Sequence, residues 1–225
     1  MWNELLAVIA PPVCAGCRGP AGAAGALLCP ACVRALPWLG ERVCRRCGQP
    51  FHGGRACPAA GAAFATAWAP VAYERSALAL VRELKFRGAL AAAGLMAAQM
   101  TANAPPWATA DVVAIVPTPA AAARARRRGF DPAGLLADEV ARRLDLPVAG
   151  CLARSGRASR QLGARRAERR APGRIGVHTR AAPPAAAVLL VDDVHTTGAT
   201  LAACARTLRD AGATTVRAMT YARAL

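Results

Sequence analysis

The sequence predicts an α/β fold, a parallel sheet with helices on both faces, preceded by a small cysteine-rich head. Three observations support this prediction. Seven of the nine cysteines fall within residues 1–60. Apolar runs of strand length alternate with helical patterns through residues 61–225, and one run ends in two aspartates and a glycine-containing turn. We therefore expect two domains, a head over residues 1–60 and a body over residues 61–225.

Length and composition exclude several classes of protein. A chain of 225 residues holds one generous domain, or one domain and a small appendage. The longest apolar stretches, residues 59–73 and 89–98, are interrupted by glycine or proline and are too short to span a bilayer. The amino-terminal segment lacks the basic flank of a secretory signal. We expect a cytoplasmic protein that is neither inserted in a membrane, disordered, nor secreted with a disulfide framework.

The charge is large and unevenly distributed. A formal net charge of +16 favours anionic partners, either phosphorylated metabolites or nucleic acid. Residues 151–187 hold nine basic side chains and one acidic side chain, which is half of the net charge. Like charges at this density repel, so we expect this stretch to be mobile until an anion neutralises it.

The first two CxxC turns of the head have the spacing of a structural zinc site. Cys14 and Cys17 form one turn, and Cys29 and Cys32 form the next. Each turn places two thiolates on one side of a tight loop, and two turns complete a tetrahedron around Zn²⁺. A redox CxxC would open a helix after a strand, and neither turn has that context. We expect one structural zinc ion on these cysteines.

A second zinc ion is compatible with the rest of the head, although its ligand pattern is less regular. Cys44 and Cys47 form a third CxxC turn, Cys57 follows alone, and Ala60 stands where a fourth turn would end. His52 fills this gap with the spacing of a zinc knuckle. The alternative is a degraded ribbon in which His52 is simply exposed.

The third turn allows two further interpretations. Its cysteines follow the Cys29–Cys32 turn after the same 11-residue gap, so a zinc site shared by those two turns stays open. Zinc knuckles also bind single-stranded nucleic acid through backbone and aromatic contacts. The residues that would make such contacts here are Arg45, Arg46 and Phe51.

The body is expected to alternate strands and helices. The predicted strands cover residues 68–73, 111–116, 188–191 and 214–221, and the predicted helices cover residues 76–86, 90–100, 132–144 and 199–211. Ser76 is the expected N-cap of the first helix, and Gly88 is its expected stop signal. A parallel sheet of this kind binds ligands at the carboxyl ends of its strands.

The most informative segment runs from residue 188 to residue 200. Four apolar residues form a strand, Asp192 and Asp193 follow, and a short loop opens a helix. Backbone N–H groups and the helix dipole bind phosphate at such a start. The loop residues available to a phosphate are Thr196, Thr197, Gly198, Ala199 and Thr200. Two adjacent carboxylates do not favour a phosphate, so they need a different partner, either a diol or hydrated Mg²⁺. A phosphate beside a diol describes a ribose 5-phosphate.

This segment resembles the phosphoribosyl pyrophosphate (PRPP) motif of type I phosphoribosyltransferases. Together with the cysteine-rich head, the chain resembles the ComF/ComFC family of competence proteins, in which a double zinc ribbon precedes a type I phosphoribosyltransferase-like domain. The resemblance continues in residues 84–88, 116–119, 126–130 and 161–170, and so spans nearly the whole chain.

The resemblance implies roles for individual residues. Asp192 and Asp193 would take the ribose hydroxyls of PRPP, bound together with Mg²⁺, and residues 196–200 would take the 5-phosphate. Residues 154–170 would form a flexible lid. The turn facing the diphosphate would consist of Pro117, Thr118 and Pro119.

The resemblance also includes basic residues outside these segments. Lys85 stands where the family keeps a basic residue. Arg126, Arg127 and Arg128 either clamp phosphate or nucleic acid, or form a solvated surface. The family usually has Asn-Gln at the position of Asp131-Pro132, so this chain lacks two amides there.

Two functions follow as expectations. The first is displacement at the anomeric carbon of PRPP by an unidentified acceptor, with Mg²⁺ and arginine neutralising the departing diphosphate. The alternative, implied by the resemblance, is a non-catalytic accessory protein that handles single-stranded DNA in natural transformation, with the DNA-uptake machinery as partner. His195 resembles a general base by its place in the loop, but we expect it to point away from the phosphate.

Overall fold

The computed structural model describes residues 12–23, 25–40, 42–50, 52, 56–86, 89–121, 126–154 and 176–225. Its main sheet is parallel, as expected. The strand order is β1 (Thr66–Trp68), β7 (Thr215–Arg223), β6 (Ala187–His195) and β3 (Val112–Pro117), and β2 (Val71–Ala72) also pairs with β7.

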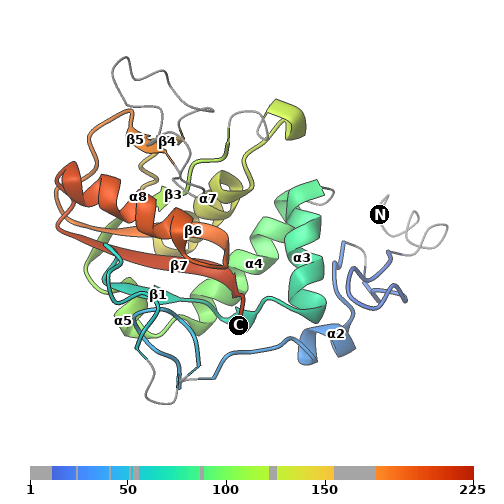
Figure 1. The fold of residues 1–225 in the computed structure, drawn as a ribbon. Coiled ribbons are helices and arrows are strands. Elements are labelled where there is room, and N and C mark those ends of the chain that lie inside the picture. Colours follow the sequence, from blue (N-terminus) through green and yellow to red (C-terminus); the bar gives the residue numbers. More distant parts are fainter. Residues whose placement is uncertain are drawn as a thin grey trace, which may run out of the picture.

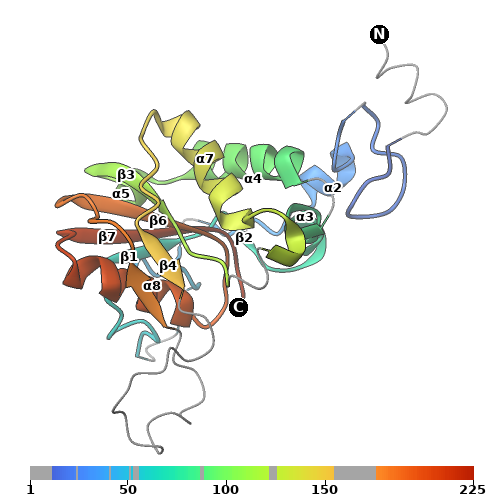
Figure 2. The ribbon, with the colours of Figure 1, turned by 90° about the horizontal axis from the view of Figure 1, so that it is seen from above.

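Helices cover both faces of this sheet (Figure 2). One face carries α4 (Ala89–Asn103) and α7 (Pro132–Leu144), with α3 (Arg75–Phe86) beside α4, and the other carries α8 (Ala199–Asp210). The α7 helix begins where the Asp131 carboxylate accepts a hydrogen bond from the Ala133 N–H at 3.1 Å. Pro132 at its first turn suits this start, because the missing N–H would have no partner in the helix. The helices α3, α4, α7 and α8 correspond to the four helices predicted in the body, which are thus confirmed.

The sheet separates two apolar cores. On one face, the buried side chains of Leu80, Met96 and Leu136 pack with Leu189 of β6. On the other face, Leu201 and Leu208 of α8 pack with Val188 and Leu190. Both faces of β6 are thus covered, which explains why residues 188–191 form an uninterrupted apolar run.

β6 and β7 extend further toward their carboxyl ends than the sequence predicts, and one predicted strand is divided. β6 continues through Asp192 and Asp193 to His195, because β7 pairs with it as far as Arg223. The acidic pair therefore belongs to the end of a strand and not to the loop after it. The strand expected over residues 68–73 is divided at Pro70, which has no N–H to donate to a ladder.

Several short elements were not predicted, and one cap was wrong. The unpredicted elements are α2 (Pro30–Arg34), α5 (Pro106–Thr109) and the antiparallel pair of β4 (Leu152–Arg154) with β5 (Val177–Thr179). Ser76 is not an N-cap: it lies buried inside α3, where its hydroxyl hydrogen-bonds the Cys32 thiol. In the part of the chain that the structure describes, no helix has the length and apolar character to cross a membrane.

The cysteine-rich head contacts the body at two separate places. Residues 12–23 and 25–34 lie beside α3, whereas residues 42–50 and 56–65 lie beside β1 and α5 (Figure 1). Cys14 belongs to the apolar core of α3 and α4, and Cys47 belongs to the core of α8. Each half of the head therefore packs on its own side of the body.

Candidate functional site

A polar cleft of about 310 Å³ lies at the carboxyl ends of β3 and β6. This is the edge at which parallel sheets bind ligands. Its walls come from both strand ends, the last turn of α3 and the amino end of α7. The residues lining it are Tyr73, Lys85, Thr118, Pro119, Ala120, Arg128, Asp131, Pro132, Ala133, Arg154, Asp192, Asp193, Val194, Thr196 and Thr200.

The two aspartates of this cleft have different partners. Asp193 forms an ion pair with Lys85, whose Nζ lies 2.8 Å from its Oδ2. Asp192 accepts a hydrogen bond from the Asp193 N–H at 2.9 Å and another from the Thr118 hydroxyl. Lys85 therefore compensates mainly the charge of Asp193, a role that could not be predicted from the sequence.

Burial and the adjacent Asp193 charge raise the pKa of Asp192 to about 7. The Asp193 N–H, Thr118 and Lys85 act in the opposite direction but do not offset these two effects. Near neutral pH the Asp192 carboxyl is consequently present in both forms. It donates one hydrogen bond when protonated and only accepts when ionised, and both forms suit a hydroxyl-bearing ligand.

Residues 196–198 connect β6 to α8 and leave the amino end of that helix accessible. Gly198 is the N-cap of α8 with a φ of 79°, which glycine adopts without steric cost. A Cβ atom at this position would lie 2.7 Å from His195 Nε2, so a larger residue would displace the buried His195 ring. The first turn of α8 carries no acidic side chain, and its N–H groups have no partners within the helix. This end of α8 therefore favours an anion.

The loop separates two cavities. Thr196 and Thr200 line the cleft. Thr196, Thr197, Gly198 and Ala199 line a second cavity of about 480 Å³. The structure thus brings the predicted loop residues together, but only part of the loop faces the aspartates.

His195 lines the second cavity and not the cleft. It is the last residue of β6, is 3% exposed, and packs edge-on against the Phe64 ring at 6.2 Å between ring centres. Burial and the Arg223 charge lower the pKa of His195 to about 4, so the imidazole is neutral at pH 7. A buried side chain outside the cleft does not serve as a general base for a ligand in the cleft.

The three successive arginines are divided by the structure. Arg126 and Arg127 are exposed, whereas Arg128 lines the cleft. The Arg128 guanidinium stands over the Phe86 ring at 5.2 Å from its centre. Its buried Nε has no hydrogen-bond partner among the described residues. A buried donor without a partner is unfavourable, and an anionic oxygen in the cleft would satisfy it.

The predicted diphosphate-side turn and lid are placed only in part. Pro117 ends β3, Thr118 and Pro119 line the cleft, and the Thr118 N–H donates to the Val191 carbonyl at 2.9 Å. Arg154 at the end of β4 also lines the cleft. The remaining lid residues up to 170 lie outside the described residues.

Sequence reasoning assigned no role in the site to Tyr73 or Asp131, which both line the cleft. Asp131 caps α7, and burial raises its pKa, with the Asp193 charge contributing. Its position before Pro132 is a helix-start signal and could have placed it at this edge. Tyr73 follows the short strand β2, and no local pattern marks it.

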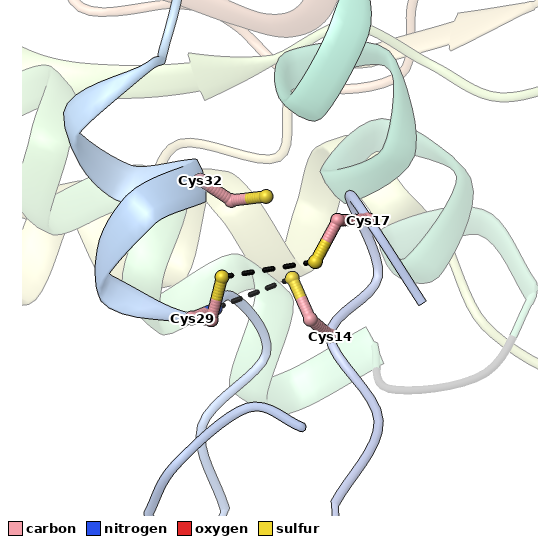
Figure 3. Close-up of side chains that lie close together, drawn as sticks. All are labelled: Cys14, Cys17, Cys29 and Cys32. Atoms are coloured by element: carbon pink, nitrogen blue, oxygen red, sulfur yellow. Dashed lines mark hydrogen bonds between the residues drawn. The ribbon is translucent and has the colours of Figure 1, made fainter. Parts of the chain in front are cut away.

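The first four cysteines form one cluster, with their sulfur atoms facing one another (Figure 3). Cys17 Sγ lies 3.8 Å from Cys29 Sγ, and Cys14 Sγ accepts a hydrogen bond from the Cys29 N–H at 3.2 Å. Burial acts against ionisation of Cys14, but backbone N–H donors lower its pKa to about 6. Gly16 allows this packing, since a Cβ atom there would lie 2.9 Å from Cys32 Sγ.

The second cluster consists of Cys44, Cys47, His52 and Cys57. Cys44 Sγ lies 3.9 Å from Cys57 Sγ, and Cys47 Sγ lies 3.4 Å from His52 Nε2. His52 therefore takes the fourth position, and the interpretation of His52 as simply exposed is wrong. The shared site between the second and third CxxC turns is also wrong, because these turns belong to different clusters.

Both clusters fit tetrahedral Zn²⁺. In each, the ligand atoms lie within 4.8 Å of one another. Zn–S bonds of about 2.3 Å in a tetrahedron place two sulfurs roughly 3.8 Å apart. One sulfur pair in the first cluster is at 3.8 Å, and one in the second is at 3.9 Å. The donor sets are thiolates and one imidazole, which zinc prefers. Zinc in these sites would hold the turns of the head together.

Two families of domains match separate parts of the chain. The double zinc ribbon domain family matches residues 5–60, and the phosphoribosyl transferase domain family matches residues 132–224. A search of curated proteins gave no match. The second match includes Asp192, Asp193 and the whole loop to Thr200. The chain therefore combines a double zinc ribbon with a phosphoribosyltransferase domain, which is the domain architecture of ComF-like proteins.

Proposed function

We propose that this protein binds PRPP, or a related ribose 5-phosphate, together with Mg²⁺, and transfers the phosphoribosyl group to an acceptor. One observation carries the proposal: the Asp192–Asp193 pair and the amino end of α8 meet at the same cleft. A ligand with a diol and a terminal phosphate has the two chemistries that these groups select.

The cleft residues suggest how such a ligand would be held. The N–H groups and hydroxyls of residues 196–200 would bind the 5-phosphate, and the Asp192–Asp193 pair would accept hydrogen bonds from the ribose hydroxyls. Arg128, with its unpartnered Nε, would contact the diphosphate beside Thr118 and Pro119. Mg²⁺, when bound, would supply further positive charge to the diphosphate, and the carboxylates are the oxygen donors it prefers.

In the transfer step, the bond between the anomeric carbon and a diphosphate oxygen would break as a bond to the acceptor forms. The electron pair of the broken bond leaves with the diphosphate, so positive charge develops on the ribose and negative charge on the leaving group. The contribution of Arg128 would be to stabilise that negative charge. Asp192 and Asp193 would orient the sugar, and their charge favours the cationic ribose.

Calorimetry tests the ligand site directly. PRPP with Mg²⁺, and ribose 5-phosphate alone, should both bind the full-length, zinc-loaded protein with one site. The double variant Asp192→Asn/Asp193→Asn should lose this binding, whereas Arg126→Gln, an exposed arginine outside the cleft, should keep it. Absence of binding to the wild-type protein would remove the proposal. Release of diphosphate from PRPP in the presence of candidate acceptors then tests turnover.

A second candidate function, handling of single-stranded DNA in natural transformation, is favoured by a different cavity. A groove of about 590 Å³ between the head and α5 contains Trp38, Trp68 and Trp107, three of the four tryptophans in the chain. The Arg45 guanidinium stands over the Trp107 ring at 5.5 Å from its centre. Among the described residues, no carboxylate lines this groove, and exposed aromatic and arginine planes stack well with unpaired bases.

In this candidate function, the tryptophan-lined groove takes the place of the zinc knuckle as the binding site for nucleic acid. Arg46 donates to the carbonyls of residues 59–65 and so is not available to a ligand, and Phe51 lies outside the described residues. Oligothymidylate affinity should fall steeply with salt, and Trp38→Ala should weaken it by about tenfold, since one stacked base contributes about 1–3 kcal/mol. A flat salt response, or full affinity in Trp38→Ala, would contradict this function.

A further inference from the structure

Arg223, the last residue of β7, is a buried arginine that touches both domains. Only 4% of its surface is exposed. Its Nε donates to the Cys47 carbonyl at 3.0 Å. Its Nη1 donates to the carbonyls of His195 at 2.8 Å, Thr196 at 2.6 Å and Ala224 at 2.6 Å. One side chain therefore joins the second metal cluster to the start of the loop at α8.

The hydrogen bonds of Arg223 to two loop carbonyls determine which way the next backbone N–H groups of the loop point. In a planar trans peptide the carbonyl and the following N–H point in opposite directions. Because Arg223 holds the Thr196 carbonyl, the N–H of Thr197 points away from Arg223, and the same holds for the His195 carbonyl and the Thr196 N–H. Arg223 lines the second cavity and not the cleft, so it acts from outside the proposed ligand site.

The hydrogen bond from Arg223 Nε to the head depends on the conformation of the Cys44–Cys47 turn. Cys47 is both a member of the metal cluster and the residue whose carbonyl receives Arg223 Nε. Gly48, with a φ of 69°, brings the turn close to the body: a Cβ atom there would lie 3.2 Å from the Ala67 carbonyl and 3.8 Å from Arg223 Cδ. Burial lowers the pKa of Arg223, although the guanidinium stays charged, and such a cation needs its acceptors in place. A turn without its metal would no longer hold one of them.

We propose that Arg223 is a positioning residue that couples metal binding at Cys44, Cys47, His52 and Cys57 to the conformation of the phosphate loop. This inference rests on the proposed function of that loop. Coupling between two sites is reciprocal, so a phosphorylated ligand in the cleft also tightens metal binding at the second cluster, by the same factor. The first cluster, which packs on α3, takes no part in this coupling.

Arg46 offers a matched control in the same turn. Its guanidinium donates to the carbonyls of Ala59, Ala60, Ala62 and Ala65, and these contacts hold the segment after Cys57 without touching the phosphate loop. Arg46→Gln and Arg223→Gln thus each remove arginine contacts to four backbone carbonyls. Only Arg223→Gln also removes contacts to His195 and Thr196.

The experiment compares wild type, Arg223→Gln, Arg223→Lys and Arg46→Gln as full chains loaded with zinc. Zinc content, melting temperature and calorimetric affinity for ribose 5-phosphate are measured for each. We expect Arg223→Gln to weaken the ligand at least tenfold while two zinc ions remain, Arg223→Lys to restore part of the affinity, and Arg46→Gln to stay within about threefold of wild type. Equal losses in Arg46→Gln and Arg223→Gln, or no loss in Arg223→Gln, would overturn the proposal.

A second measurement needs no ligand and separates this inference from the proposed function. Hydrogen exchange of a peptide spanning residues 195–202 is compared between wild type and Cys57→Ser, which lacks one ligand of the second cluster. We expect faster exchange in Cys57→Ser, and little further change when Cys57→Ser is added to Arg223→Gln. If wild type binds no ribose 5-phosphate, the proposed function fails, but this exchange pattern still decides the coupling. Unchanged exchange in Cys57→Ser refutes it.

Discussion

Replacement of Asp192 by asparagine is expected to stabilise the fold and weaken the ligand site at the same time. Burial and Asp193 raise the pKa of Asp192 from 3.8 to about 7. The stability associated with this raised pKa is fully present below pH 3.8 and is lost as the pH rises through about 7. Asparagine does not ionise, keeps an oxygen for the Asp193 N–H, and adds an N–H donor beside the Asp193 carboxylate.

The magnitude follows from the size of the shift. A displacement from 3.8 to about 7 corresponds to about 4 kcal/mol at pH 8. The carboxyl borders an open cleft, and solvent screens part of its repulsion, so we expect about half of this, ~2 kcal/mol. At pH 5.5 most wild-type molecules are protonated at Asp192, and the expected gain falls to about 1 kcal/mol.

Urea unfolding at pH 8 and pH 5.5 measures these gains. Asp193→Asn is the matched control, because it makes the same chemical change but removes the 2.8 Å ion pair with Lys85. It should bring no gain in the free energy of unfolding at either pH. The reasoning is refuted if Asp192→Asn is less stable than wild type at pH 8, or if its gain is the same at both pH values.

Three further predictions concern the residues around the loop. The His195 pKa is lowered from 6.5 to about 4, so the stability that the neutral imidazole contributes is present above pH 6.5 and is lost as the pH falls toward 4. Between pH 7 and pH 5, the free energy of unfolding should therefore fall by about 2 kcal/mol less in His195→Gln than in wild type. Gly198→Ala should lower the free energy of unfolding by about 1–3 kcal/mol and abolish ribose 5-phosphate binding, since its Cβ would lie 2.7 Å from His195 Nε2; unchanged calorimetry would contradict this. Metal analysis should find two zinc ions per wild-type chain and one in Cys57→Ser, and a single zinc in both proteins would refute the second site.

The parts of the site that the sequence predicts are those encoded within a few neighbouring residues. The acidic pair, Gly198 and the helix after it lie in one run of chain, so a local pattern sufficed to bring them together. The CxxC turns are likewise local, and His52 was found by its spacing from Cys47 and Cys57. Strand and helix periodicity gave the parallel sheet for the same reason.

The parts that could not be predicted depend on contacts between distant segments. The strand register of β7 decides that Asp192 and Asp193 belong to β6, and no pattern within residues 188–195 shows where that pairing ends. Arg223 meets Cys47 across 176 positions of sequence, and at the sequence level it is one arginine among many. The division at residue 60 stays a prediction, since Cys14 and Cys47 pack into cores of the body.

Ser76 and His195 show how tertiary contacts override local preference. Serine before a helical pattern is a good cap, but the Ser76 side chain instead meets the Cys32 thiol. His195 sits next to threonines in a segment typical of a solvated loop. It is buried because Phe64, from the segment after the second cluster, packs against it.

The most direct test of the central claim is a crystal structure of the zinc-loaded protein soaked with ribose 5-phosphate. We expect the phosphate at the N–H groups of residues 196–200 and the sugar hydroxyls within hydrogen-bonding distance of Asp192 and Asp193. Electron density for the ligand elsewhere, or a cleft that stays empty at a saturating concentration, would contradict it.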